Sequence, residues 1–136
     1  MFFNKKEKTE SNFLIKIGAL LIHAAKIDEN YTEEEEEIVK KTLLELGSNN
    51  KDLSQIINEA KAIEENAIQI LDFTQEIKNL PEQEKIKIIE ALWNIIYSNK
   101  DADMYESNLM RRLSGLLYID NKIMGEIKEK IRKKNT

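Results

Sequence analysis

The residues of this chain that could do chemistry are polar side chains at a matched spacing. Asp28 is followed seven positions later by Glu35, and Asn99 is followed seven positions later by Glu106. Carboxylate and amide oxygens are the ligands that Ca²⁺ and Mg²⁺ prefer in proteins, and affinity rises with the number of charged ligands. These four residues could therefore surround one acidic locus whose oxygens are of a kind that a divalent cation takes as ligands.

Other chemistries lack their residues or motifs. The chain has no cysteine and one histidine, His23, so thiolate nucleophiles, iron–sulfur clusters and multi-histidine metal sites are excluded. It contains neither a glycine-rich phosphate loop nor a serine or threonine in a nucleophile context. An EF-hand loop starting at Asp28 fails, because its sixth position is Glu33 and its twelfth is Val39. The sequence therefore predicts a protein that is not an enzyme.

Length and charge further limit the kind of protein that this sequence can encode. The chain has 136 residues, enough for one domain, and we expect a flexible N-terminus over 1–11 and a single helical domain over 12–134. With 21 basic and 25 acidic residues the net charge is −4, which lacks the basic face of a general nucleic-acid binder. No apolar run is long enough to cross a membrane, and residues 1–12 are too polar for a signal peptide. We expect a cytoplasmic protein without a nucleic-acid partner or an integral membrane segment.

The elements that must position the candidate ligands are helices. Apolar residues recur at helical spacing almost throughout, and strict apolar–polar alternation is absent. This pattern predicts a compact all-α bundle of seven helices. The expected helices cover 11–27, the stretch from after Thr32 to Gly47, a segment from about 52, 66–80, the stretch from Pro81 to about 98, a segment that starts after 103, and 121–134.

An internal repeat relates the two candidate loops. Shifting the chain by 71 residues aligns 20–47 with 91–118, and each stretch reads as a helix, a short polar loop and a second helix. A duplicated helix–loop–helix usually packs around a pseudo-twofold axis, since each copy has the same apolar face to bury. We expect this packing to bring the two polar loops together.

These residues resemble the TerB family, the tellurite-resistance-associated helical domain, which is also related to the N-terminal region of the DjlA membrane co-chaperone. The similarity covers roughly 14–131, and its matching stretches are 24–28 through Glu35, 71–74 with Ile77, 91–93 through 105–106, and 111–113. The resemblance implies a pseudo-symmetric helical bundle in a stress-response protein, with an acidic surface that binds a divalent metal. It thereby makes Asp28, Glu35, Asn99 and Glu106 the candidate metal ligands, with Ca²⁺ or Mg²⁺ as the candidate cofactor. The alternative that it implies is a metal-independent module that binds a protein partner, as the membrane-associated co-chaperone domain would.

The family's Asp-Gly loops are altered in this chain. The first reads Asp28-Glu29, which keeps the acid and loses the glycine. The second reads Asn99-Lys100, which replaces the acid by a neutral amide and adds a cation. Because cation affinity follows ligand charge, we expect the second half of the metal site to be weak or absent.

The two glutamates also have a structural interpretation. Thr32-x-x-Glu35 is a capping box, and Asp103-x-x-Glu106 is a close analogue. Acids near a helix N-terminus are also favourable against the helix dipole. Helix capping and metal binding therefore both remain open for Glu35 and Glu106, whereas His23 is expected to be a half-buried structural residue and Trp93 a core aromatic.

Overall fold

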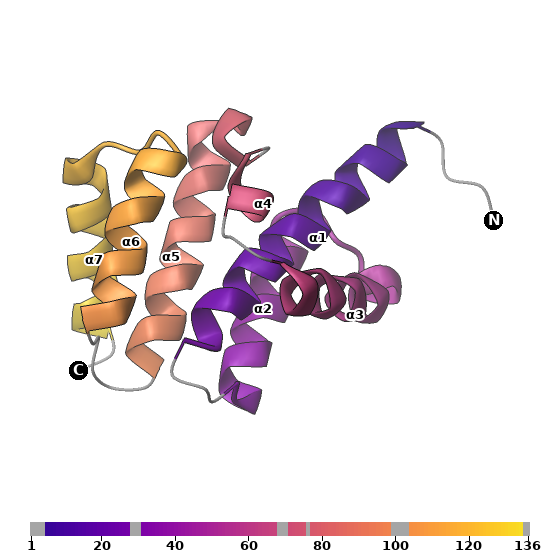
Figure 1. The fold of residues 1–136 in the computed structure, drawn as a ribbon, viewed down its shortest axis with the longest axis horizontal. Helices are drawn as coiled ribbons and strands as arrows, with labels where there is room; N and C mark the ends of the chain where they lie inside the picture. Colours follow the sequence, from indigo (N-terminus) through magenta and orange to yellow (C-terminus); the bar gives the residue numbers. More distant parts are fainter. Residues whose placement is uncertain (1–4, 28–30, 68–70, 76, 99–103, 135–136) are drawn as a thin grey trace.

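The computed structural model describes residues 5–27, 31–67, 71–75, 77–98 and 104–134. Within these ranges the chain forms seven α-helices and one short 3-10 helix, which confirms the predicted all-α bundle (Figure 1). Their bounds are α1 Lys5–Ala25, α2 Glu33–Glu45, α3 Asn50–Asn66, α4 Leu71–Thr74, η1 Ile77–Asn79, α5 Glu82–Ser98, α6 Met104–Leu116 and α7 Asn121–Lys134. None of the described helices combines the length and the apolar character that a membrane crossing requires.

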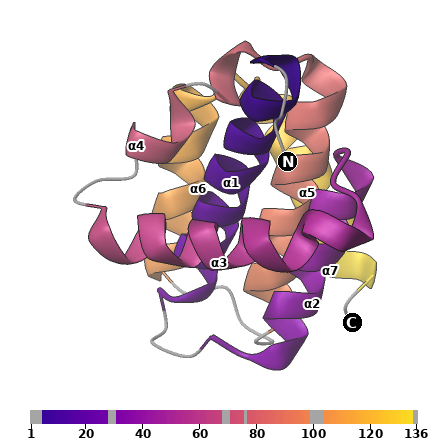
Figure 2. The same cartoon turned by 90° about the vertical axis from the view of Figure 1, so that its right-hand side faces the viewer.

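The core lies around α1 and α5, the two most apolar of the long helices. α1 packs against α2, α3 and α4. α5 packs against α2 and α7, and it also packs against α1. Figure 2 shows α3 crossing over α1, while Figure 1 shows α5, α6 and α7 standing side by side. Leu20 of α1 and Leu92 of α5 are fully buried. Each fully buried side chain of this size contributes about 1.5–3 kcal/mol to the free energy of unfolding.

Several helix ends follow from local sequence signals. Thr32 caps α2, and Gly47 follows its C-terminus at a φ of 120°, a conformation that L side chains rarely adopt. Asn49 caps α3, because its side-chain oxygen accepts a hydrogen bond of 2.8 Å from the backbone N–H of Asp52. Pro81 precedes α5 and accepts from the N–H of Lys85. These signals are local, so the sequence alone could show them.

Two helix boundaries differ from the prediction. α1 begins at Lys5 rather than near residue 11, while the expected flexibility of 1–11 stays a prediction. The helix expected over 66–80 is wrong, because the chain leaves the helical conformation at Ala67 and then forms only the single turn α4 and η1. Phe73 and Ile77 are nonetheless buried. Packing of these two side chains in the core has overridden the helical spacing that their positions suggest.

The helix bounds repeat along the chain with the predicted offset of 71 residues. α2 starts at Glu33 and α6 at Met104, and both contain 13 residues. α3 starts at Asn50 and α7 at Asn121, so the repeat includes a third helix that the sequence comparison did not cover. The expected pseudo-twofold axis stays a prediction, since these bounds describe the order of the elements along the chain.

The C-terminal ends of α2 and α6 share a hydrogen-bond pattern at the same offset. Ser48 N donates to Leu43 O at 2.9 Å, and Ile119 N donates to Ser114 O at 2.9 Å. Both are the outer bond of a Schellman motif, which requires a left-handed residue after the helix. Gly47 supplies that residue in the first copy.

Tyr118 supplies the left-handed residue in the second copy, with a φ of 56°. The buried Lys85 donates from Nζ to the carbonyl oxygen of Leu117 at 2.8 Å, which places a cation at the C-terminal end of α6. The ammonium groups of Lys78 and Lys85 also lie 5.7 and 6.0 Å from the centre of the exposed Tyr118 ring. Cation–π attraction of this kind favours the ring position despite its backbone conformation.

Candidate functional site

Glu35 is the one predicted metal ligand whose side chain the structure describes, and it forms the predicted capping box. Thr32 N donates to Glu35 Oε1 at 2.8 Å, and Glu35 N donates to Thr32 Oγ1 at 3.1 Å. The residue is 0% exposed. Oε1 is therefore used by the backbone at the start of α2, as the capping interpretation requires.

The other three predicted ligands fall on residues that the structure leaves out. Asp28 and Asn99 lie outside the described residues, and Glu106 belongs to α6 but its side chain is not described. Their convergence with Glu35 therefore stays a prediction. Among the described side chains, no group of three or more His, Cys, Asp or Glu is arranged to hold a metal ion.

The acidic run of α2 makes contacts that the sequence did not suggest. Nζ of Lys61 on α3 forms an ion pair with Oε1 of Glu36 at 2.7 Å. The Tyr31 hydroxyl donates a hydrogen bond to the same oxygen at 3.5 Å. The hydrogen bond from Lys61 is the main reason that the pKa of Glu36 is lowered from its ordinary value. Burial, together with the neighbouring charge of Glu36, raises the pKa of the Tyr31 phenol. This cluster ties α2 to α3 and is structural in character.

His23 is half-buried and paired, as a structural histidine would be. Its Nδ1 lies 3.4 Å from Oε1 of Glu64 on α3, and Lys26 Nζ lies 2.6 Å from the other oxygen of the same carboxylate. The His23 ring also lies 6.2 Å from the ring of Phe73 in α4, measured between centroids. The sequence could not indicate Glu64, because it lies 41 positions from His23 and on a different helix.

Trp93 is a buried core aromatic, as predicted. Its ring stacks on that of Tyr97 at 5.8 Å between centroids, and Lys128 Nζ of α7 lies 5.3 Å from its centre. Burial raises the pKa of Tyr97. The three residues hold α5 and α7 together.

A cleft of about 300 Å³ lies where α2, α5 and α7 meet, and the sequence analysis did not find it. Its volume is at the lower end of the range for ligand-binding pockets. Apolar and neutral polar side chains from all three helices form much of the lining: Ile38, Thr42, Ala91, Asn94, Ser98 and Ile131. The signal that could have pointed to it is the repeat, since Asn94 occupies the position that His23 has in the first copy.

Charged side chains surround this cleft. Lys130 and Glu90 form an ion pair at 3.6 Å. Lys41, Lys87 and Lys134 come from three different helices, and none of them makes an ion pair or side-chain hydrogen bond within the part of the chain that the structure describes. Glu34 and Glu45 also line the cleft, so the lining carries four lysines and three glutamates, a net charge of 4 − 3 = +1, and three of the lysines have no partner at ion-pair distance among the described residues.

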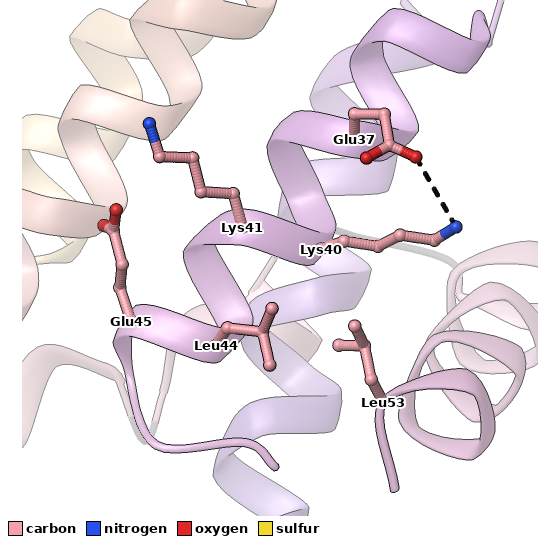
Figure 3. A pocket seen from close by; sticks show the side chains of 6 residues that line it. All are labelled: Glu37, Lys40, Lys41, Leu44, Glu45 and Leu53. Atoms are coloured by element: carbon pink, nitrogen blue, oxygen red, sulfur yellow. Dashed lines mark ion pairs between the residues drawn. The ribbon is translucent and has the colours of Figure 1, made fainter. Parts of the chain in front are cut away.

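A second, more open depression of about 570 Å³ lies on the outer face of α2. Figure 3 shows Leu44 and Leu53 facing each other there, beside the 3.7 Å ion pair of Lys40 with Glu37. Lys41 points to the opposite side of α2 in the same view. The depression has only two apolar side chains in its lining, and of its two lysines Lys40 is paired while Lys41 also lines the cleft between α2, α5 and α7.

The chain matches a known protein family over most of its length. The model of the family described as tellurite resistance protein TerB matches residues 14–129. No curated protein and no solved structure matches the chain. The matched range includes α2, α5 and most of α7, and hence most of the cleft lining.

Proposed function

The chain belongs to the TerB family, and from this premise we propose that it is a non-enzymatic binding domain that acts in the cytoplasm in tellurite resistance or a related stress response. The observation that carries this proposal is the cleft between α2, α5 and α7. Binding sites are usually concave, and this cleft is concave and gathers polar groups from three helices. The occupant is a protein partner, bound without a metal ion.

The metal-independent form of the proposal rests on Glu35. Its Oε1 accepts the hydrogen bond from Thr32 N, and the residue is closed to solvent. The cleft is lined by other side chains of α2, α5 and α7, and its four lysines outnumber its three glutamates, so its net charge of +1 disfavours a free cation. Binding at the cleft therefore needs no metal ion.

A strain that lacks the gene tests the proposed function. Plasmids carry the wild-type chain, an Asn94→Trp variant that fills the cleft, or an Asn108→Trp variant that makes the same change on the exposed face of α6. We expect wild type and Asn108→Trp to restore growth on tellurite, and Asn94→Trp to fail although its circular dichroism spectrum is unchanged. Full rescue by a folded Asn94→Trp protein, or a deletion strain without a stress phenotype, would contradict the proposal.

A divalent cation at Asp28, Glu35, Asn99 and Glu106 is the second candidate function. The observation that favours it is the position of the two glutamates, each of which is the third residue of its helix, α2 or α6. The two loops before these helices would then supply the remaining oxygens.

Calorimetric titration tests the second candidate. Wild type is compared with Asp28→Asn and Glu106→Gln variants in Ca²⁺ and in Mg²⁺, with Glu34→Gln as the control on the exposed face of α2. These variants leave the Glu35 cap intact. Binding that is lost in both site variants and kept in the control supports the cation site, whereas no binding at millimolar cation refutes it.

A further inference from the structure

We propose that the cleft between α2, α5 and α7 binds a short acidic segment of a partner protein, with an aromatic side chain of that segment seated against Asn94. The inference rests on the proposed function, because it states the chemistry of the partner at the same site. Two observations support it. An aromatic side chain covers the corresponding position on α1, and lysines without an ion-pair partner among the described residues line the cleft.

The first copy of the repeat already holds an aromatic side chain at this position. His23 on α1 contacts the ring of Phe73 at 6.2 Å between centroids. Phe73 comes from α4, a single turn with the sequence Leu-Asp-Phe-Thr, and is 1% exposed. Its neighbour Asp72 is exposed. A short segment with an aromatic residue beside an acid thus covers this part of α1.

The second copy has the same helix position without such a cover. Asn94 on α5 corresponds to His23 under the offset of 71 residues that the starts of α6 and α7 follow. Asn94 lines the cleft of about 300 Å³, and within the described ranges no aromatic side chain lines it. Ala91 and Ile131 supply apolar surface beside the Asn94 amide, so the lining suits a ring with a polar neighbour.

The charge around the cleft selects an acidic segment. After the Lys130–Glu90 pair is formed, Lys41, Lys87 and Lys134 remain without a partner in the described part of the chain. A carboxylate that binds among them forms ion pairs without separating existing ones, and complementary charge also favours encounter and orientation.

Two glutamates line the cleft besides the paired Glu90. Glu34 and Glu45 lie at opposite ends of α2, eleven positions apart, which corresponds to about 16 Å along the helix axis. Lys41 lies between them. Lys87 lies at the start of the α5 stretch that lines the cleft, so the unpaired lysines are spread along it, and four lysines against three glutamates leave the lining a net charge of +1 that favours an acidic ligand.

The probe is a capped synthetic peptide with the sequence of residues 71–79, titrated into ¹⁵N-labelled full-length protein. Two control peptides replace its phenylalanine by alanine or its aspartate by lysine. We expect saturable shifts of the Asn94, Ala91 and Ser98 signals with the first peptide, and at least about tenfold weaker binding of either control. Absence of shifts at millimolar peptide, or equal binding of all three peptides, would overturn the proposal.

Charge reversal tests the lysines. A Lys41→Glu, Lys87→Glu, Lys134→Glu protein is compared with a Lys51→Glu, Arg111→Glu, Lys122→Glu protein, in which the same net change falls on exposed positions outside the cleft. We expect about tenfold weaker peptide binding for the cleft variant and less than about twofold for the control. Equal losses would show that only net charge matters and would refute the site.

Two further outcomes identify a different occupant. Shifts of the cleft signals that depend on protein concentration without peptide would assign the cleft to a second copy of this chain. Shifts with anionic phosphatidylglycerol vesicles but not with peptide would assign it to a lipid surface. Either result overturns the peptide proposal. If Asn94→Trp abolishes growth on tellurite while no peptide binds, the proposed function stands and the inferred partner chemistry fails.

Discussion

The capping box at the start of α2 allows the structural and metal roles of Glu35 to be separated. Removing the Thr32 hydroxyl by Thr32→Ala leaves Glu35 N without its 3.1 Å acceptor, and N-cap losses of this kind cost about 1 kcal/mol. Glu35→Ala removes the carboxylate that accepts from Thr32 N at 2.8 Å. Because the change leaves a part-buried backbone N–H without its acceptor, we expect a loss of about 2 kcal/mol.

The two losses in the free energy of unfolding should not be additive. Both bonds close the same first turn, so the double variant should be less destabilised than the sum of the single variants by at least about 0.5 kcal/mol. Urea unfolding followed by circular dichroism measures each value. With a slope of about 1–3 kcal/mol per molar urea, a loss of 2 kcal/mol lowers the midpoint by about 1 M.

Glu34→Ala is the matched control, because Glu34 lies in the same turn but is exposed. We expect its effect to stay within about 0.5 kcal/mol. All variants are measured with Ca²⁺ and with a chelator, and the differences should be the same in both. If Thr32→Ala is neutral and the loss in Glu35→Ala occurs only with Ca²⁺, the capping explanation is wrong and Glu35 is a metal ligand.

Three other predictions test the surrounding structure. The hydrogen bond from Lys61 is the main cause of the lowered pKa of Glu36, so this pair stabilises the fold above the ordinary pKa of 4.5. Its contribution to the free energy of unfolding is lost as the pH falls below that value. Glu36→Gln should therefore flatten the pH dependence of urea unfolding in that acid range. Gly125→Ala should raise the free energy of unfolding by about 0.5–1 kcal/mol, since nothing lies within 4 Å of the added carbon, whereas Gly47→Ala should lower it by about 1–3 kcal/mol because of its φ of 120°. Gly18→Val should lower it by about 1–3 kcal/mol, since even a first added carbon lies 3.1 Å from Cβ of Ala60 on α3; a neutral result in thermal unfolding would show that α1 and α3 can separate at no cost.

Local chemistry explains what the sequence could predict. The cap at Thr32, the left-handed glycine at Gly47 and the start of α7 at Asn121 depend on residues within one helical turn, and all three are in place. The repeat offset was also visible from residue types alone. These features set the order and the bounds of most helices, and the family assignment agrees with them.

Long-range packing explains what the sequence could not predict. Phe73 and Ile77 have helical spacing, yet their burial against the core breaks the expected helix into α4 and η1. The partner of His23 is Glu64 on α3, and no periodicity relates the two residues. The cleft likewise depends on where α2, α5 and α7 end up relative to one another, which composition and spacing do not encode. The candidate metal ligands were matched by spacing, and of the four only Glu35 has a described side chain, which serves as a cap.

Trp93 also gives this chain an intrinsic fluorescence probe of its folding. It is the sole tryptophan, it is buried, and its neighbours Tyr97 and Lys128 belong to α5 and α7. Its fluorescence emission therefore reports on the packing of α5 against α7, while far-ultraviolet dichroism averages over every helix. Coincident transitions in the two signals would mean that the two halves of the repeat melt as one unit. An earlier fluorescence transition would mean that the second half, which carries much of the cleft, opens first.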